Sequence, residues 1–213
     1  MSASEAYSIP QAGTIPRAVQ RPLARDSAIT LIRRLIWVYF LLLLFEGALR
    51  KWFLPSISQE LLIVRDPLAL WIYYLAFNRG IFPTGNPYLA KAAQWTILAA
   101  IVSLFVVGAH WKAVAYGVRP NLLHFPLIFV MARVMNKEDA ILFGKAFLLL
   151  ALPMTWVVSQ QFQSDRDHLL NTAAGGVGYQ LETSGGKVRA SGTFTFVSGI
   201  VFYYCFSVAF IIY

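Results

Sequence analysis

The chain has 213 residues, of which 58% are hydrophobic and only 13% charged, and its mean hydropathy is +0.59. Soluble domains are nearer half apolar and a quarter charged, so the composition excludes an ordinary soluble protein and favours an integral membrane protein. The net charge of +8 would suggest a nucleic-acid partner in a soluble chain. Here the basic residues lie in loops and near the ends of apolar segments, which fits membrane topology and anionic lipid better. We therefore expect the lipid bilayer as a partner, and no nucleic acid.

Residues 1–32 are polar and proline-containing and lack the apolar core of a signal peptide, which predicts a disordered cytoplasmic tail. Residues 33–213 alternate between polar stretches and apolar runs about long enough to cross a hydrocarbon core of roughly 30 Å. They predict an all-α fold, a polytopic transmembrane helix bundle of about six spans, at residues 35–49, 59–77, 92–109, 121–134, 140–158 and 193–213. The Gly-rich stretch 159–190 is predicted to be a periplasmic loop. Because the sequence ends within an apolar run, we expect a truncated chain.

Five arginines precede the first span, and the positive-inside rule then places the N-terminus in the cytoplasm. Alternating spans put the Gly-rich loop outside, together with Arg50, Lys51, Arg119 and Arg189. So many basic residues on the outer side run against the same rule. We interpret them as a sign that something anionic binds there.

The dipeptide Arg65-Asp66 lies within the second predicted span, where ionisable groups are tolerated when they are paired or face a wet cavity. Adjacent residues on a helix do not face each other, so each needs its own partner. Arg65 can pair with Glu46, and Asp66 with Arg50 or Lys51. Two interpretations remain open, namely a salt-bridge network that fixes helix packing and a direct contact with a ligand.

Other polar residues near the predicted outer ends are candidates for the same site. Glu46 and Arg50 are spaced to pair on one helix face, and a carboxylate beside basic groups can act as a general base on a sugar hydroxyl. Arg119 has a guanidinium that either grips phosphate oxygens or reaches the lipid headgroups. His124, one turn deeper, is typical of a helix–helix hydrogen bond rather than of a catalyst.

Arg189 stands where the Gly-rich loop meets the sixth span. Ser191 or Thr193 is predicted to cap that helix, and the free N–H groups of a helix N-terminus favour an anion. Arg189 would add a positive charge at the same place, which predicts an anion site.

Metal and cofactor chemistry finds no support in the sequence. The three histidines, His110, His124 and His168, are widely spaced, and Cys205 is the single cysteine. A Gly-rich phosphate loop with its lysine is also absent from the sequence. We expect no metal and no cofactor.

Several of these segments, taken in order, resemble a family of bacterial membrane proteins related to O-antigen polymerases and ligases. They are Phe45-Glu46-Gly47-Ala48-Leu49-Arg50-Lys51-Trp52, Val64-Arg65-Asp66-Pro67, Tyr116-Gly117-Val118-Arg119, Gln160-Gln161-Phe162 and Arg189-Ala190-Ser191-Gly192-Thr193-Phe194. In that family Asn-Pro often follows the last element. This chain has Thr195-Phe196-Val197-Ser198-Gly199 instead, so the match is imperfect.

The resemblance implies a glycosyltransferase of the bacterial inner membrane that joins polyprenyl-pyrophosphate-linked sugars at the periplasmic face. It also implies other polysaccharide-assembly proteins as partners. Under this hypothesis Arg65, Arg119 and Arg189 hold the donor pyrophosphate, and Glu46 or Asp66 positions them or activates the acceptor hydroxyl. The chain would be the N-terminal part of such an enzyme, whose relatives usually have ten or more spans.

Two other functions use the same residues. A transporter of an anionic or lipid-linked substrate would need the arginines together with alternating access, for which inverted repeats and broken helices are the usual sign. A non-catalytic membrane scaffold, or an inactive fragment, would need neither chemistry nor movement.

Overall fold

The computed structural model describes residues 27–176, 178–183 and 185–212, and this part of the chain is built from helices without a β-strand. Four helices are long and apolar enough to cross a membrane: Ser27–Phe53, Pro87–Phe105, Trp111–Val134 and Lys137–Gln163. The predicted all-α membrane fold is confirmed. Sidedness is not fixed by the fold, and the cytoplasmic N-terminus stays a prediction.

Helix α1 (Ser27–Ala48) lies at the centre and continues into a π-helical turn, η2 (Leu49–Phe53). It includes the last six residues of the predicted disordered tail, 27–32, because Ile29 and Ile32 are buried in the core. Residues 1–26 of that predicted tail lie outside the described residues. Helix α1 packs against α3 (Arg65–Asn78), where Ala69 and Ala76 are fully buried and let the two backbones approach closely.

The second predicted span, 59–77, is not one helix. A short helix, α2 (Ser58–Leu61), is followed by a turn, and α3 starts afresh at Arg65 with Pro67 in its first turn. Proline is favoured there because its missing N–H has no partner to lose. The break places Arg65 and Asp66 at the start of α3, where both side chains contact neighbouring helices.

The fourth predicted span, 121–134, is longer than expected. Helix α5 (Trp111–Arg119), a π-helical turn η4 (Pro120–His124) and α6 (Leu127–Val134) follow one another as a single path. Gly117 and Pro120, which are unfavourable residue types inside a helix, lie in the part of the path before residue 121. The π-helical turn accommodates Pro120 at its first position, so the helical path continues.

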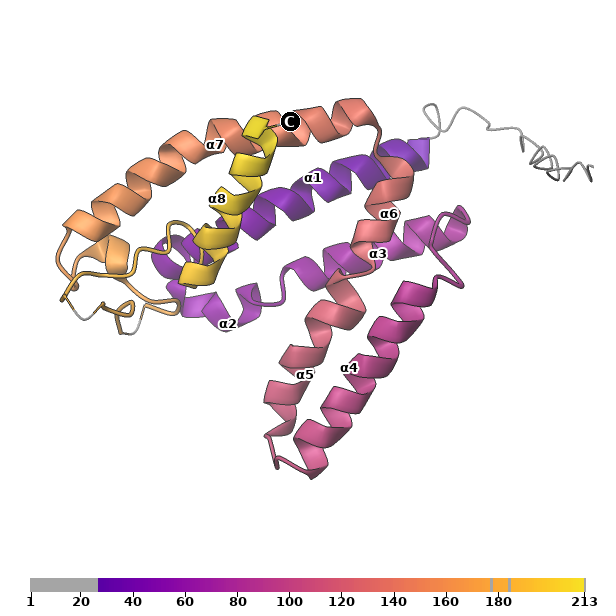
Figure 1. Cartoon of the computed structure of the whole chain (residues 1–213), viewed down its shortest axis with the longest axis horizontal. Coiled ribbons are helices and arrows are strands. Elements are labelled where there is room, and N and C mark those ends of the chain that lie inside the picture. The colour runs from indigo at the N-terminus through magenta and orange to yellow at the C-terminus, as the bar shows by residue number, and fades with distance from the viewer. Residues whose placement is uncertain (1–26, 177, 184, 213) are drawn as a thin grey trace, which may run out of the picture.

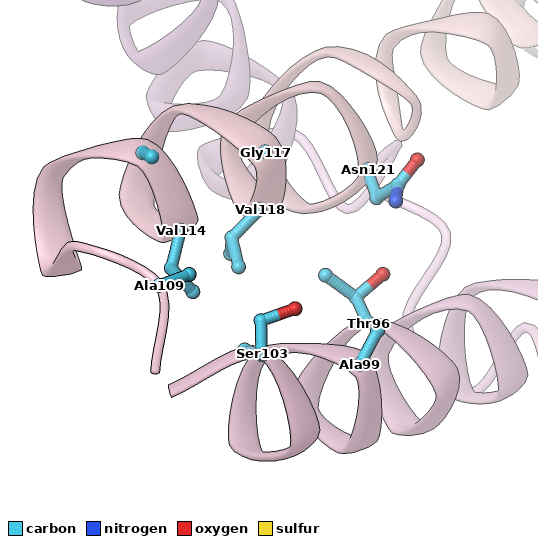
Figure 2. Close-up of a pocket in the computed structure, with 10 residues that line it drawn as sticks. Thr96, Ala99, Ser103, Ala109, Val114, Gly117, Val118 and Asn121 are labelled. Carbon is cyan, nitrogen blue, oxygen red and sulfur yellow. The ribbon is translucent and has the colours of Figure 1, made fainter. Parts of the chain in front are cut away.

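Helix α4 (Pro87–Phe105) pairs with α5 in a hairpin that projects away from the other helices (Figure 1). Only Thr96 of α4 is buried. Small residues, among them Ser103 and Gly117, leave a space of about 290 Å³ between the two helices (Figure 2). Such an exposed apolar helix needs lipid or another protein around it, in agreement with the membrane fold.

Helix α7 (Lys137–Gln163) runs beside α1, with Trp37 stacked on Phe143 at 3.9 Å between ring centroids. It extends five residues into the predicted loop 159–190 because buried Gln161 bonds loop backbone at its end. Helix α8 (Val197–Ile212) packs on α7 and begins four residues later than predicted, while residue 213 lies outside the described residues.

Ends of α1, α3, α6 and α7 gather into two groups on opposite sides. At one end Arg33 of α1 donates to the Val134 carbonyl at 2.7 Å, and Arg133 of α6 donates to the Ile81 carbonyl after α3 at 2.7 Å. Turn η2, helix α2 and the loop between α7 and α8 gather at the other end (Figure 1). The candidate site lies on this second side.

Candidate functional site

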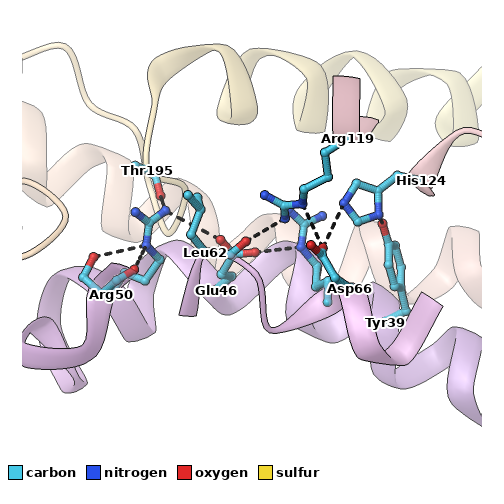
Figure 3. A network of polar contacts seen from close by, with 10 residues as sticks. Tyr39, Glu46, Arg50, Leu62, Asp66, Arg119, His124 and Thr195 are labelled. Atoms are coloured by element: carbon cyan, nitrogen blue, oxygen red, sulfur yellow. Dashed lines mark hydrogen bonds and ion pairs between the residues drawn. The ribbon is translucent and has the colours of Figure 1, made fainter. Parts of the chain in front are cut away.

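Polar side chains from four parts of the chain meet between α1, α3 and the α5–η4 junction (Figure 3). They come from the middle and end of α1, from η2, from the first turn of α3, and from the end of α5 with η4. We call this group the charged cluster; its members are Tyr39, Glu46, Arg50, Arg65, Asp66, Arg119 and His124.

Glu46 holds one half of the charged cluster together. Its carboxylate accepts from Arg65 Nε at 2.7 Å and lies 3.6 Å from Arg50 Nη1. The Glu46 side chain is only 8% exposed, so its charge needs a positive partner close by. The predicted pairs of Glu46 with Arg65 and with Arg50 are both confirmed.

Asp66 holds the other half, with different partners from those predicted. Its Oδ1 accepts from Arg119 Nε at 2.8 Å and lies 3.4 Å from His124 Nε2 (Figure 3). The predicted pairing with Arg50 or Lys51 is wrong. The first turn of α3 faces η4, whereas η2 carries both basic residues away toward other partners.

His124 joins the charged cluster to α1. Its Nδ1 lies 2.9 Å from the Tyr39 hydroxyl, which confirms the predicted helix–helix hydrogen bond. The Arg65 guanidinium lies 5.7 Å from the centre of the Tyr39 ring, a cation–π distance. Tyr39 lies seven residues before Glu46, or about 10 Å deeper along α1. The cluster therefore runs from the end of α1 into its middle.

Two π-helical turns carry cluster residues or adjoin them. Turn η2 contains Arg50, and η4 contains His124 and directly follows Arg119. π-helical turns are rare and occur frequently at functional sites. Sequence reasoning missed both, and Pro120 is the one residue that could have signalled a departure from α-helix.

Lys51 has a role that the sequence did not reveal. It is 2% exposed, and its ammonium donates to the carbonyl oxygens of Gly192 at 2.6 Å and Phe194 at 2.9 Å and to Ser191 Oγ at 3.1 Å. These residues belong to the stretch 191–195, which we call the docked segment. Lys51 thus fixes this segment against the end of α1.

Other contacts hold the docked segment equally firmly. Thr193 Oγ1 donates to the Leu44 carbonyl at 2.6 Å, and Arg50 Nη1 donates to Thr195 Oγ1 at 3.3 Å. The Gln161 amide both accepts from Gly192 N at 2.8 Å and donates to its carbonyl at 3.2 Å. Ser191 and Thr193 therefore do not cap the last helix, and the prediction that they do is wrong.

Gly47 is the residue that lets the docked segment lie on α1. A Cβ at this position would collide with the Thr193 carbonyl oxygen and lie 2.6 Å from Thr195 N. Because both are backbone atoms, neither can rotate aside. We expect Gly47→Ala to destabilise the protein by about 2 kcal/mol, in the range for overpacking, as measured by thermal unfolding in detergent. Gly117→Ala is the control, since its Cβ would meet nothing within 4 Å.

Arg189 does not reach the charged cluster. It is exposed and, within the part of the chain that the structure describes, its side chain makes neither an ion pair nor a hydrogen bond. The predicted anion site at a helix N-terminus is not formed there, because α8 begins at Val197, after the docked segment. Arg189 lies two residues before that segment, in the loop.

The charged cluster carries more positive than negative charge. Its three arginines, which stay protonated in proteins, face only the carboxylates of Glu46 and Asp66. Among the described residues Arg65 donates through Nε to Glu46 and lies against the Tyr39 side chain, and Arg119 donates through Nε and Nη2, the latter to the Leu62 carbonyl. Terminal nitrogens of both guanidinium groups are therefore available to an anion.

Comparisons of this chain with protein-family models, with curated proteins and with solved structures found no match. The fold itself defines the class: an all-helical membrane protein. Within it, a cluster of arginines and carboxylates reaches from a helix end into the helical core.

Proposed function

We propose that this chain belongs to a polysaccharide polymerase-like glycosyltransferase that acts on polyprenyl-pyrophosphate-linked sugars at the periplasmic face. The observation that carries the proposal is the hydrogen bonding of Arg65 and Arg119. Each guanidinium is oriented through Nε by a carboxylate, and each keeps terminal N–H groups for a further acceptor. Arginine donors held in this way suit phosphate oxygens.

The proposed reaction needs no more than the groups in and beside the charged cluster. The acceptor hydroxyl attacks the anomeric carbon of the donor sugar, the bond from that carbon to the pyrophosphate oxygen breaks, and the departing charge falls on the pyrophosphate. Arg65 and Arg119 stabilise that charge as it develops. The hydroxyl proton passes to Asp66, whose side chain is 19% exposed, in preference to Glu46, which two arginines already hold.

Arg189 provides the cleanest test of this proposal. Among the described residues no ion pair or hydrogen bond holds its side chain, so under this proposal its guanidinium is free to contact the donor pyrophosphate from the loop. Arg189→Ala in the chromosomal gene should therefore abolish polymer formation while the protein level in the membrane is unchanged. The measurement is polymer content by gel electrophoresis of cell extracts. Arg166→Ala is the matched control, since Arg166 lies in the same loop and its contacts, an ion pair with Glu182 at 3.3 Å and a cation–π contact with Tyr179 at 5.7 Å, are at the surface.

Arg119→Ala should abolish the polymer as well, although it also removes the partner of Asp66. Normal polymer length in both alanine variants would defeat the proposal. Uptake of a labelled anionic substrate into vesicles, without new glycosidic bonds, would favour a transporter instead.

A further inference from the structure

An apolar groove runs along the face that α1 shares with α6, α7 and α8. Its volume is about 680 Å³, and its lining includes Leu43, Met131, Phe143 and Phe206. Apart from Tyr39 and Asn136, every lining side chain is apolar. It is the larger of the two described cavities.

The groove and the charged cluster meet at Tyr39. The tyrosine lines the groove, while its hydroxyl bonds His124 and its ring lies beneath the Arg65 guanidinium. Ile128, another lining residue, lies one helical turn beyond His124. The apolar groove is therefore continuous with the charged cluster, which carries excess positive charge.

The size of the groove limits what can occupy it. A helix with its side chains is about 10–12 Å across, so this volume would hold roughly a turn and a half of one. A single hydrocarbon chain is much thinner and fills such a space lengthwise. Lipid tails are all similarly apolar, so the groove alone selects no particular lipid. Selection has to come from the charged end.

We propose that the groove binds the hydrocarbon chain of a phosphate-headed lipid whose headgroup lies against Arg65 and Arg119. This inference rests on the proposed function for the headgroup contacts and adds the path of the chain. The lipid passes from the charged cluster over the Tyr39 ring and along α1 between α6, α7 and α8. The protein thus recognises the lipid through both its phosphate headgroup and its hydrocarbon chain.

The test is photolabelling of the purified protein in nanodiscs of uncharged phosphatidylcholine. The probe is an isoprenyl phosphate with a diazirine in its chain, and the corresponding isoprenyl alcohol is the uncharged counterpart. We expect mass spectrometry to find the phosphate probe on groove residues such as Leu43 and Phe206. Ala132→Trp and Ala140→Trp fill the groove from exposed positions and should each lower that labelling about tenfold, or about 1.4 kcal/mol of binding.

The matched control is Ala99→Trp, which adds the same bulk at an exposed alanine in the space between α4 and α5 (Figure 2). It should leave labelling unchanged. Arg65→Ala should reduce labelling by the phosphate to the level given by the alcohol. Labelling of α4 as strong as that of the groove, or labelling indifferent to Ala132→Trp, would overturn the proposal.

The inference and the proposed function fail separately. Photolabelling needs no sugar transfer, so groove labelling in a protein that makes no polymer would keep the lipid path and reject the glycosyltransferase. Polymer formation, together with labelling that neither tryptophan variant lowers, would keep the glycosyltransferase and reject the lipid path.

Discussion

Lys51→Met is expected to destabilise the folded protein by about 3 kcal/mol. The ammonium makes three hydrogen bonds at a position that is 2% exposed, and two of its acceptors are backbone carbonyls of the docked segment. Methionine fills a similar space but donates nothing. An unsatisfied buried acceptor costs about 1–3 kcal/mol, and Gly192 keeps only its bond from Gln161.

The measurement is equilibrium unfolding in mixed micelles, read by circular dichroism. Lys145→Met is the matched control, because Lys145 also lies within an apolar helix but is exposed, and its replacement should change stability by less than about 0.5 kcal/mol. Equal effects of the two substitutions would show that the contacts of Lys51 are not what holds the docked segment.

The helices and some of the polar pairs were predictable from the sequence because few alternatives existed. A long apolar run without a charged residue, such as 92–109, has no stable arrangement in a bilayer except a helix. A buried carboxylate such as Glu46 must find positive charge, and Arg50 one turn away and Arg65 in the next span were the available choices. His124 likewise needed a polar partner from another helix.

The partner of Asp66 was not predictable because sequence spacing cannot choose among several basic residues in reach. The partner of Asp66 is determined by the three-dimensional fold. The break before α3 and the π-helical turn that contains His124 decide which basic residues lie within reach. Lys51 escaped attention for a different reason. Its acceptors are mostly backbone carbonyls, which every residue has, so no pattern of side chains in the sequence predicts its contacts with the docked segment.

The docked segment was mistaken for a helix start because Ser191 and Thr193 are common capping residues. What excludes a helix there is Gly192, whose φ of +59° lies in the left-handed region. Its missing side chain also gives room to Met154, whose sulfur would lie 2.8 Å from a Cβ. Such three-dimensional crowding leaves no trace in the periodicity of the sequence.

The pair of Asp66 with Arg119 separates the structural role of the charged cluster from its proposed chemical role. Asp66→Asn or Arg119→Met alone leaves an uncompensated charge next to apolar helices. Each should cost about 3 kcal/mol, near the lower end for a buried pair, because both side chains keep a small exposed fraction. The double variant leaves no unpaired charge at this position, and we expect at least about 2 kcal/mol of the combined loss to return.

Polymer formation should respond differently from stability in this cycle. Neither single variant nor the double variant should make polymer. The double variant regains stability, but it still lacks the guanidinium that would donate hydrogen bonds to the phosphate and the carboxylate that would accept the proton. A double variant that folds and also polymerises would mean that the pair only holds helices together. In that case the arginines of the cluster would be structural, and the phosphate-gripping role of Arg119 would be lost along with the reaction assigned to Asp66.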